Sequence, residues 1–180
     1  MNREAEWSRG LVHLYVGDGK GKSTAAAGLA LRALGGGKTV YFCQFLKGGT
    51  SGELAPLARL GAVVDTQARV ERFTFQMTDE ERAACARRSG QALAACAQAL
   101  AGGAYDLVVL DEGVDAANKG MIPWEDLLQA VENRAPRVEV VLTGRKPDPR
   151  LEALADYYTQ MVCQKHPYQE GIPARKGIEY

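Results

Sequence analysis

The sequence predicts one α/β domain over residues 1–180, with a mostly parallel sheet of about six strands and helices on both faces. Three observations support this. Short apolar runs alternate with helix-like runs along the chain. The strand-like runs are continuously apolar, as in strands covered on both faces. A length of 180 residues and an apolar share of 46% suffice for one full core and argue against disorder.

Six runs have the composition of strands. The clearest are Y-D-L-V-V-L and R-V-E-V-V-L, which are short, rich in valine and leucine, and bounded by turn residues. A weaker run holds the sequence A-V-V-D-T. The expected strands are residues 11–16, 38–46, 62–66, 105–110, 137–142 and 158–163.

Four helices are expected between the strands, at residues 23–34, 78–101, 123–132 and 148–155. Gly35 is a stop signal for the first, and Thr78 with Glu81 forms a capping box at the start of the second. Cys85 and Cys96 are about three turns apart, so we expect both on one helix face as small apolar residues. Residues 47–52 and 67–77 lack a regular pattern and follow strands, where functional loops of α/β sheets lie.

The composition argues against several classes of protein. The chain has 22 basic and 22 acidic residues, which argues against a nucleic-acid partner. No apolar run reaches the roughly 20 residues that span a bilayer, and M-N-R-E-A-E-W-S-R-G lacks the apolar segment of a signal peptide. The four cysteines form no C-x-x-C pair, so a zinc or redox site is not expected. We expect a cytoplasmic protein without a membrane partner.

A glycine-rich loop follows the first expected strand. The sequence G-D-G-K-G-K-S-T covers Gly17, Asp18, Gly19, Lys20, Gly21, Lys22, Ser23 and Thr24. Glycines let successive backbone N–H groups point inward, and the following helix adds its positive N-terminus. Lys22 supplies a cation for phosphate oxygens, and Ser23 a hydroxyl for magnesium. The loop therefore predicts binding of a nucleotide triphosphate with Mg²⁺; a glycine-rich turn without a ligand is the alternative.

The loop departs from the common pattern G-x-x-x-x-G-K-[ST]. Counting back from Gly21, the first glycine would fall at Val16, but it stands at Gly17. The loop is thus one residue tighter and carries a second lysine, Lys20. We expect that it need not hold the triphosphate in the orientation of ordinary ATPases.

The run Y-D-L-V-V-L ends in two acids, Asp111 and Glu112. At the carboxyl end of a parallel strand they should lie near the glycine-rich loop of residues 17–24, called the phosphate loop below, where one of the acids binds magnesium directly or through water. Together with Ser23 they are the predicted metal residues. The alternative is a pair that caps a helix N-terminus.

Several motifs in this order resemble the corrinoid adenosyltransferases, the ATP:cob(I)alamin type built on a P-loop fold. The short loop is similar to the variant loop of that family, and the resemblance extends through nearly the whole chain. The other matching pieces are Q-F-L-K-G at residues 44–48, G-E at 52–53, F-T-F at 73–75, L-D-E at 110–112, T-G-R at 143–145 and the tail from His166 to Tyr180.

The resemblance implies a RecA-like P-loop fold, a homodimer, and ATP and a corrinoid as substrates. The reaction would transfer the 5′-deoxyadenosyl group of ATP to Co(I) and release triphosphate, with the nucleotide lying in the reverse sense to ordinary P-loop enzymes. It also implies a flavodoxin-like or other electron donor for Co(II), and adds Lys47 to the expected ATP contacts.

The resemblance places Phe73 and Phe75 against the lower face of the corrinoid. Apolar rings there would displace the axial ligand and ease reduction of cobalt. The family has tryptophan where this chain has Phe75, and a small core plug under the loop is the alternative for both rings.

Adenosyl transfer is a displacement at carbon that needs no general base, only positioning and neutralisation of the leaving group. Lys22, Glu112 and Arg145 are the predicted catalytic residues. Two other functions stay open. A small P-loop kinase would need a lid rich in arginine, but Arg82, Arg87 and Arg88 lie within an expected helix. A non-enzymatic nucleotide switch would need a large exposed partner surface.

Overall fold

The computed structural model describes residues 8–48, 51–70 and 74–180. Its centre is one six-stranded sheet in the order β3-β2-β4-β5-β1-β6, and every neighbouring pair is parallel. The prediction of a mostly parallel sheet of about six strands is confirmed. The strands are β1 (Val12–Val16), β2 (Val40–Gln44), β3 (Val63–Asp65), β4 (Leu107–Asp111), β5 (Glu139–Gly144) and β6 (Tyr157–Gln160).

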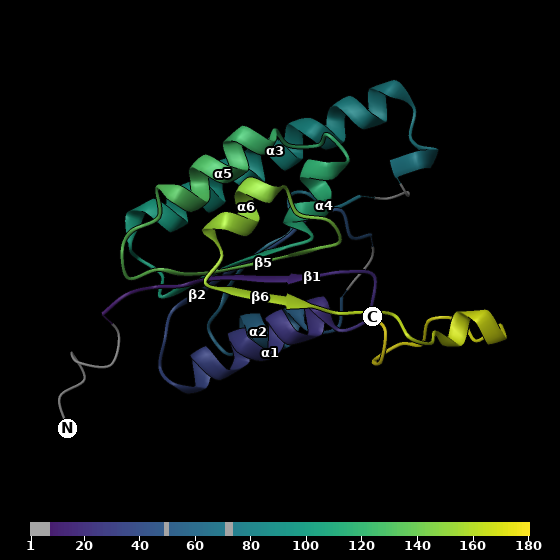
Figure 1. The fold of residues 1–180 in the computed structure, drawn as a ribbon, viewed down its shortest axis with the longest axis horizontal. Coiled ribbons are helices and arrows are strands. Elements are labelled where there is room, and N and C mark those ends of the chain that lie inside the picture. The colour runs from purple at the N-terminus through teal and green to yellow at the C-terminus, as the bar shows by residue number, and fades with distance from the viewer. Residues whose placement is uncertain (1–7, 49–50, 71–73) are drawn as a thin grey trace.

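Helices cover both faces of the sheet (Figure 1). One face carries α1 (Lys22–Gly35) and α2 (Leu54–Arg59). The other carries α3 (Asp79–Gly102), α4 (Gly113–Asn118), α5 (Trp124–Glu132) and α6 (Pro149–Leu154). Two short 3₁₀ segments, η1 (Thr74–Gln76) and η2 (Pro167–Glu170), complete the described elements.

The two-sided cover explains why the strands are apolar without alternation. In β4, Val108 and Leu110 belong to the core under α3 and α5, whereas Leu107 and Val109 belong to the core under α1. Successive strand residues point to opposite faces, so each residue of a covered strand needs an apolar side chain.

Local details bear out some expectations and correct others. The capping box of Thr78 and Glu81 is present, and Cys85 and Cys96 are both buried on α3. The sixth strand ends at Gln160 rather than at residue 163, and the Met161 backbone that follows it lies against Gly17 and Gly19 of the phosphate loop. Helices α2 and α4 were not expected.

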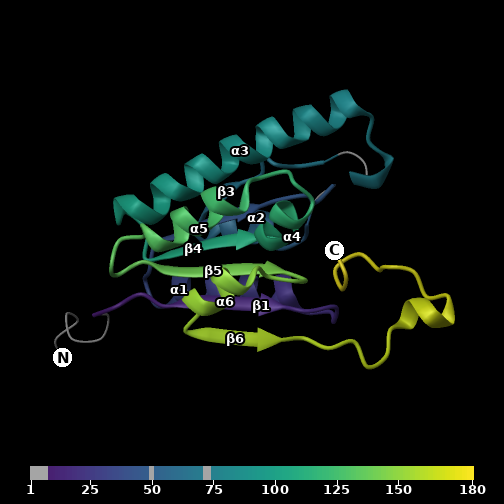
Figure 2. The ribbon, with the colours of Figure 1, turned by 45° about the horizontal axis from the view of Figure 1, so that its top comes forward.

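All strands run in the same direction, so their carboxyl ends share one edge of the sheet (Figure 2). The loops that follow β1, β2, β4 and β5 start at this edge, and the tail after β6 turns back toward it. In the described ranges, no helix is both long and apolar enough to cross a membrane.

Candidate nucleotide-binding site

The phosphate loop joins β1 to α1 and is built on close backbone contact. Gly17 and Gly21 have φ angles of 111° and 116°, which favour glycine. A Cβ on Gly17 would lie 2.3 Å from the carbonyl oxygen of Met161, and one on Gly19 would lie 2.8 Å from its carbonyl carbon. The first two glycines therefore let the loop lie directly on the segment that follows β6.

Hydrogen bonds with neighbouring segments fix residues 17–19, the first half of the loop. The Gly17 amide donates to the Arg145 carbonyl at 3.0 Å, and the Gly19 amide to the Met161 carbonyl at 2.8 Å. The carboxylate of Asp18 accepts from the Cys163 amide at 3.1 Å. Residues 17–19 thus fix the position of the loop, and of its predicted ATP contacts residues 20–24 line the cavity.

The second half of the loop presents positive charge. The Lys22 ammonium crosses the loop and donates to the Gly19 carbonyl at 2.7 Å. Helix α1 begins here with no acidic residue in its first turn, and Gly21 at its N-cap has no side chain to cap it. The first N–H groups of a helix lack partners within the helix, so they can bind an anion in front of Lys22.

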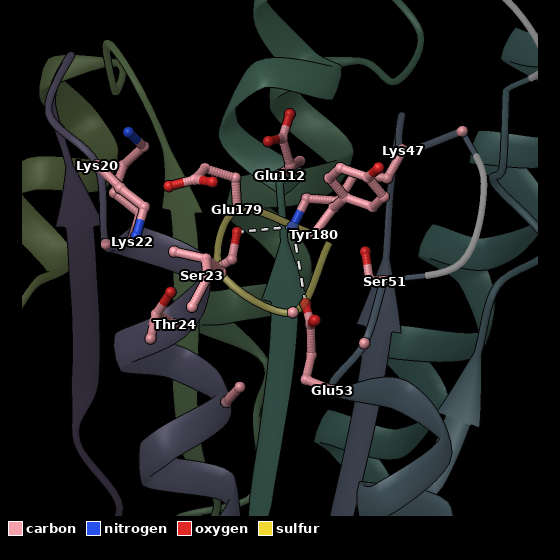
Figure 3. A pocket seen from close by; sticks show the side chains of 16 residues that line it. Lys20, Lys22, Ser23, Thr24, Lys47, Ser51, Glu53, Glu112, Glu179 and Tyr180 are labelled. Atoms are coloured by element: carbon pink, nitrogen blue, oxygen red, sulfur yellow. Dashed lines mark hydrogen bonds and ion pairs between the residues drawn. The ribbon is translucent and has the colours of Figure 1, made fainter. Parts of the chain in front are cut away.

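A cavity of about 840 Å³ opens at this edge of the sheet. The phosphate loop forms one wall, the segment after β2 a second, and the C-terminal tail a third, with Lys20, Lys22, Lys47, Glu53, Glu112, Glu179 and Tyr180 around it (Figure 3). Its lining comprises residues 20–24, 27, 47, 48, 51–53, 112 and 177–180. The cavity joins segments that are distant in sequence, as an assembled binding site does.

Asp111 lies behind the cavity and is fully buried. One carboxylate oxygen accepts a hydrogen bond from the Thr143 hydroxyl at 2.8 Å. The other accepts from the Gln44 amide at 3.0 Å and from the Lys47 ammonium at 2.8 Å. Gln44 is the last residue of β2 and Thr143 the next to last of β5, the strands on either side of β4, and no role was predicted for either. Their place at strand ends beside an acid was the available signal.

Glu112 follows Asp111 and starts α4 with a left-handed backbone, φ 61°. Its amide donates to the Thr143 hydroxyl at 2.8 Å. Burial raises the pKa of the Glu112 carboxyl, the charge of Asp111 raises it further, and Lys47 opposes both. Glu112 takes the N-cap position that the alternative interpretation named, but its side chain makes no capping bond and lines the cavity.

Lys47 connects the two walls of the site. Its ammonium donates to the Ser23 hydroxyl and to the Asp111 carboxylate, both at 2.8 Å, and lies 4.0 Å from Glu53. The preceding residue, Leu46, has φ 56°. Among the described residues, Leu46 and Glu112 are the non-glycine residues with positive φ. Such backbone strain clusters at functional sites.

The predicted magnesium residues have the right chemistry. Ser23 and Asp111 offer oxygen ligands, which Mg²⁺ prefers, and the Lys47 ammonium already lies between them as a positive group. The described part of the chain has no group of three or more His, Cys, Asp or Glu residues that could hold a metal. An ion here would complete its shell with phosphate oxygens and water.

Comparison with known proteins identifies the family. Residues 8–180 match the family model described as ATP:corrinoid adenosyltransferase BtuR/CobO/CobP. The chain belongs to this family. It is 36% identical over 178 residues to a corrinoid adenosyltransferase of Pseudomonas aeruginosa, covering 98% of this chain and 87% of that one. Relatives of the same name from Escherichia coli K12 and, as CobA, from Salmonella typhimurium are each 34% identical over 98% of this chain and 89% of theirs.

Membership of the corrinoid adenosyltransferase family confirms the resemblance, whereas the roles of individual residues stay predictions. Arg145 is exposed and lies outside the cavity lining; its amide donates to Asp115 at 3.3 Å. Phe75 is 80% exposed on η1, which is incompatible with a core plug at that position. Phe73 lies outside the described residues.

No role was predicted for residues 177–180 individually, yet Gly177, Ile178, Glu179 and Tyr180 line the cavity, the last two labelled in Figure 3. Hydrogen bonds from Arg175 lower the pKa of Glu179 to about 2, and Lys20 contributes to the shift. A carboxylate therefore stands near the second lysine of the phosphate loop. The tail motif was visible in the sequence, but its return to β1 depends on the fold.

Proposed function

We propose that this protein transfers the 5′-deoxyadenosyl group of ATP to the cobalt of a reduced Co(I) corrinoid and releases triphosphate, in adenosylcobalamin biosynthesis or corrinoid salvage. The observation that carries the proposal is the convergence of Lys20, Lys22 and Lys47 on one cavity in a chain of this family. Three cations around one cavity suit a leaving group with several negative charges.

The reaction is a displacement at carbon. The electron pair of Co(I) attacks C5′ of ATP, the bond between C5′ and its oxygen breaks, and that bond's electron pair leaves on triphosphate. No proton moves, so the protein has to position the substrates and stabilise negative charge. Lys20, Lys22 and the N-terminus of α1 would bind the triphosphate, and Arg145, at the end of β5, would support it once ATP is bound.

Ser23 and Asp111 would hold magnesium directly and Glu112 through water. The ion would neutralise charge on the phosphate oxygens. Gln44 and Thr143 would hold the Asp111 carboxylate in place by their hydrogen bonds. The carboxylate would therefore be oriented for the ion before each turnover.

The nucleotide would lie in the reverse sense to ordinary P-loop enzymes, with C5′ facing the corrinoid and the far phosphates deep in the site. The tight loop supports this orientation, because Gly17 and Gly19 lie against Met161 and Lys20 stands at the loop tip. A bound structure with the terminal phosphate facing the open side would contradict it.

Phe75, with Phe73, would contact the lower face of the corrinoid. The exposed ring of Phe75 supports this role, since a ring outside the core can contact a ligand. We further propose a homodimer in the cytoplasm, and a flavodoxin-like or other donor that reduces Co(II). No nucleic-acid or membrane partner is part of the proposal.

The proposal is tested by incubating the protein with ATP, magnesium and chemically reduced cobalamin under anaerobic conditions. Adenosyl transfer should form a light-sensitive alkyl–cobalt product and one triphosphate for each product molecule. ADP as the nucleotide product would instead indicate a kinase. ATP binding without turnover by any reduced corrinoid would indicate a nucleotide switch.

A further inference from the structure

The two side chains proposed to bind magnesium are already joined by a positive charge. The ammonium of Lys47 donates to the Ser23 hydroxyl at 2.8 Å and to the Asp111 carboxylate at 2.8 Å. These distances are those of short hydrogen bonds to an ionised group. A magnesium ion bound by both oxygens has to lie between them, where the ammonium lies now.

Asp111 needs a positive partner in the folded chain. Its side chain is fully buried, whereas that of Lys47 is 24% exposed. A buried carboxylate without a counter-charge is costly. Gln44 and Thr143 donate hydrogen bonds to Asp111 but carry no charge, so Lys47 supplies the charge that balances this carboxylate.

The backbone is shaped to aim Lys47 at this position. Leu46 is held at φ 56°, a conformation that is costly for a bulky side chain. Its amide donates to the Ala68 carbonyl at 3.2 Å, and the Val70 amide donates to the Lys47 carbonyl at 3.4 Å. The strained turn is therefore fixed by the segment after β3.

We infer that the Lys47 ammonium occupies the magnesium position in the metal-free protein and exchanges with the ion that arrives with ATP. The inference rests on the proposed function, because it assumes that Ser23 and Asp111 are the magnesium residues. The exchange keeps Asp111 neutralised in both states. It also keeps divalent ions from binding without a nucleotide, and releases Lys47 toward the triphosphate.

The released side chain has a place to go. The Glu53 carboxylate lies 4.0 Å from the Lys47 ammonium, and both side chains line the cavity (Figure 3). Lys47 can therefore turn toward the cavity while keeping an acidic neighbour. Its contact with ATP and its contact with Asp111 are then two successive states of one side chain.

The test measures stability and metal binding without ATP or corrinoid, so its outcome is independent of adenosyl transfer. Lys47→Met removes the charge but keeps most of the side-chain length. We expect its Tm to fall by roughly 5 °C in the absence of metal. Lys38→Met is the matched control, because it removes a lysine that lies 3.9 Å from another aspartate, Asp106, on the surface.

Magnesium should then restore stability to Lys47→Met alone. Millimolar Mg²⁺ should raise the Tm of this variant and leave the parent and Lys38→Met unchanged. Paramagnetic Mn²⁺, followed by its EPR signal, should bind Lys47→Met at least about tenfold more tightly than the parent.

The double variant Lys47→Met with Asp111→Asn separates charge balance from packing. Because it removes both charges, it should be more stable than Lys47→Met and should lose the response to metal. The inference is wrong if Lys47→Met binds Mn²⁺ no better than the parent, or if the double variant is as unstable as Lys47→Met. If Lys47→Met fails to fold while the double variant folds, the charge-balance role is supported.

Discussion

The site has a phosphate half, made by residues 17–24 and Asp111, and a proposed corrinoid half, represented by Phe75. The two halves are built differently. Gly17, Gly19 and Asp18 are fixed by hydrogen bonds to segments after β5 and β6, and Asp111 is buried with partners from β2, from the segment after β2 and from β5. By contrast, Phe75 lies on a single turn of 3₁₀ helix and is 80% exposed.

The difference follows from what each half would bind. A triphosphate is small and highly charged, so donors fixed beforehand bind it without reorganisation. A corrinoid is large, so the residues that contact it must stay accessible until it arrives. We therefore expect substitutions in the phosphate half to weaken ATP binding, and substitutions at Phe75 to leave it intact.

The largest effect is expected for Lys22→Ala. This change removes the cation that closes the phosphate loop, and a hydrogen bond to a charged group contributes about 1.5–3 kcal/mol. With transition-state charge added, kcat/KM for ATP should fall by at least about 100-fold. Steady-state kinetics with chemically reduced cobalamin measure this, with Lys38→Ala as the control. Unchanged kinetics in Lys22→Ala would show that Lys22 does not bind the triphosphate.

Gly19→Ala tests whether the loop depends on close backbone packing. The added Cβ would lie 2.8 Å from the backbone of Met161, so the loop or the segment after β6 has to shift. We expect ATP to bind at least about tenfold more weakly by calorimetry. Gly28→Ala is the matched control, because nothing lies within 4 Å of a Cβ on this α1 glycine.

The control variant Gly28→Ala should change the stability of the protein in a predictable direction. Gly28 is exposed within α1, where alanine is favoured over glycine by about 1 kcal/mol. Gly28→Ala should therefore raise the unfolding free energy slightly and leave ATP affinity as it is. If both glycine variants lost ATP affinity equally, the loss at Gly19 would not come from close packing against Met161.

The strands and the position of the loop between β1 and α1 were predicted better than the rest of the chain, for physical reasons. The apolar strands and the G-K-S loop carry local signals, since each residue's role depends on its neighbours in the chain. The short α2 was missed because Pro56 stands within it, and α4 because it starts with Gly113 after a left-handed Glu112. The roles of Gln44, Thr143 and Glu179 depend on which strand ends become neighbours, which a local pattern does not reveal.

Phe75→His tests the proposed contact of Phe75 with the corrinoid. Histidine would offer cobalt a new axial ligand, so reduction of bound Co(II) by an enzymatic donor should fail, while ATP binding stays at the parent value. Phe75→Trp introduces the tryptophan found at this position in the resemblance to the family, and this variant should keep activity. If Phe75→His adenosylates enzymatically reduced corrinoid at the parent rate, Phe75 does not face the cobalt. The same test applies to Phe73→His.

The smallest effect concerns the pH dependence of stability at Glu112. Burial raises its pKa in the folded state. The native carboxyl therefore keeps its proton to a higher pH than the unfolded one, and the free energy of unfolding falls as pH rises between the two pKa values. Glu112→Gln should be more stable than the parent above that window and equal to it below the ordinary glutamate pKa of about 4.3.

Denaturant unfolding of Glu112→Gln and the parent across this pH range measures the difference. The same variant should bind magnesium ATP more weakly, because the amide carries no charge to hold an ion through water. A variant that is both more stable and fully active would show that Glu112 is only the N-cap residue of α4.

The proposed reaction of ATP held by this phosphate loop takes place at C5′ and not at phosphorus. It is tested most directly with ATP that carries ¹⁸O in the oxygen between C5′ and the α-phosphorus, incubated with magnesium and Co(I) cobalamin. Mass spectrometry of the products should find the label in triphosphate, since the bond from C5′ to this oxygen breaks. Label retained on a nucleoside or nucleotide product, with cleavage at phosphorus, would contradict the account.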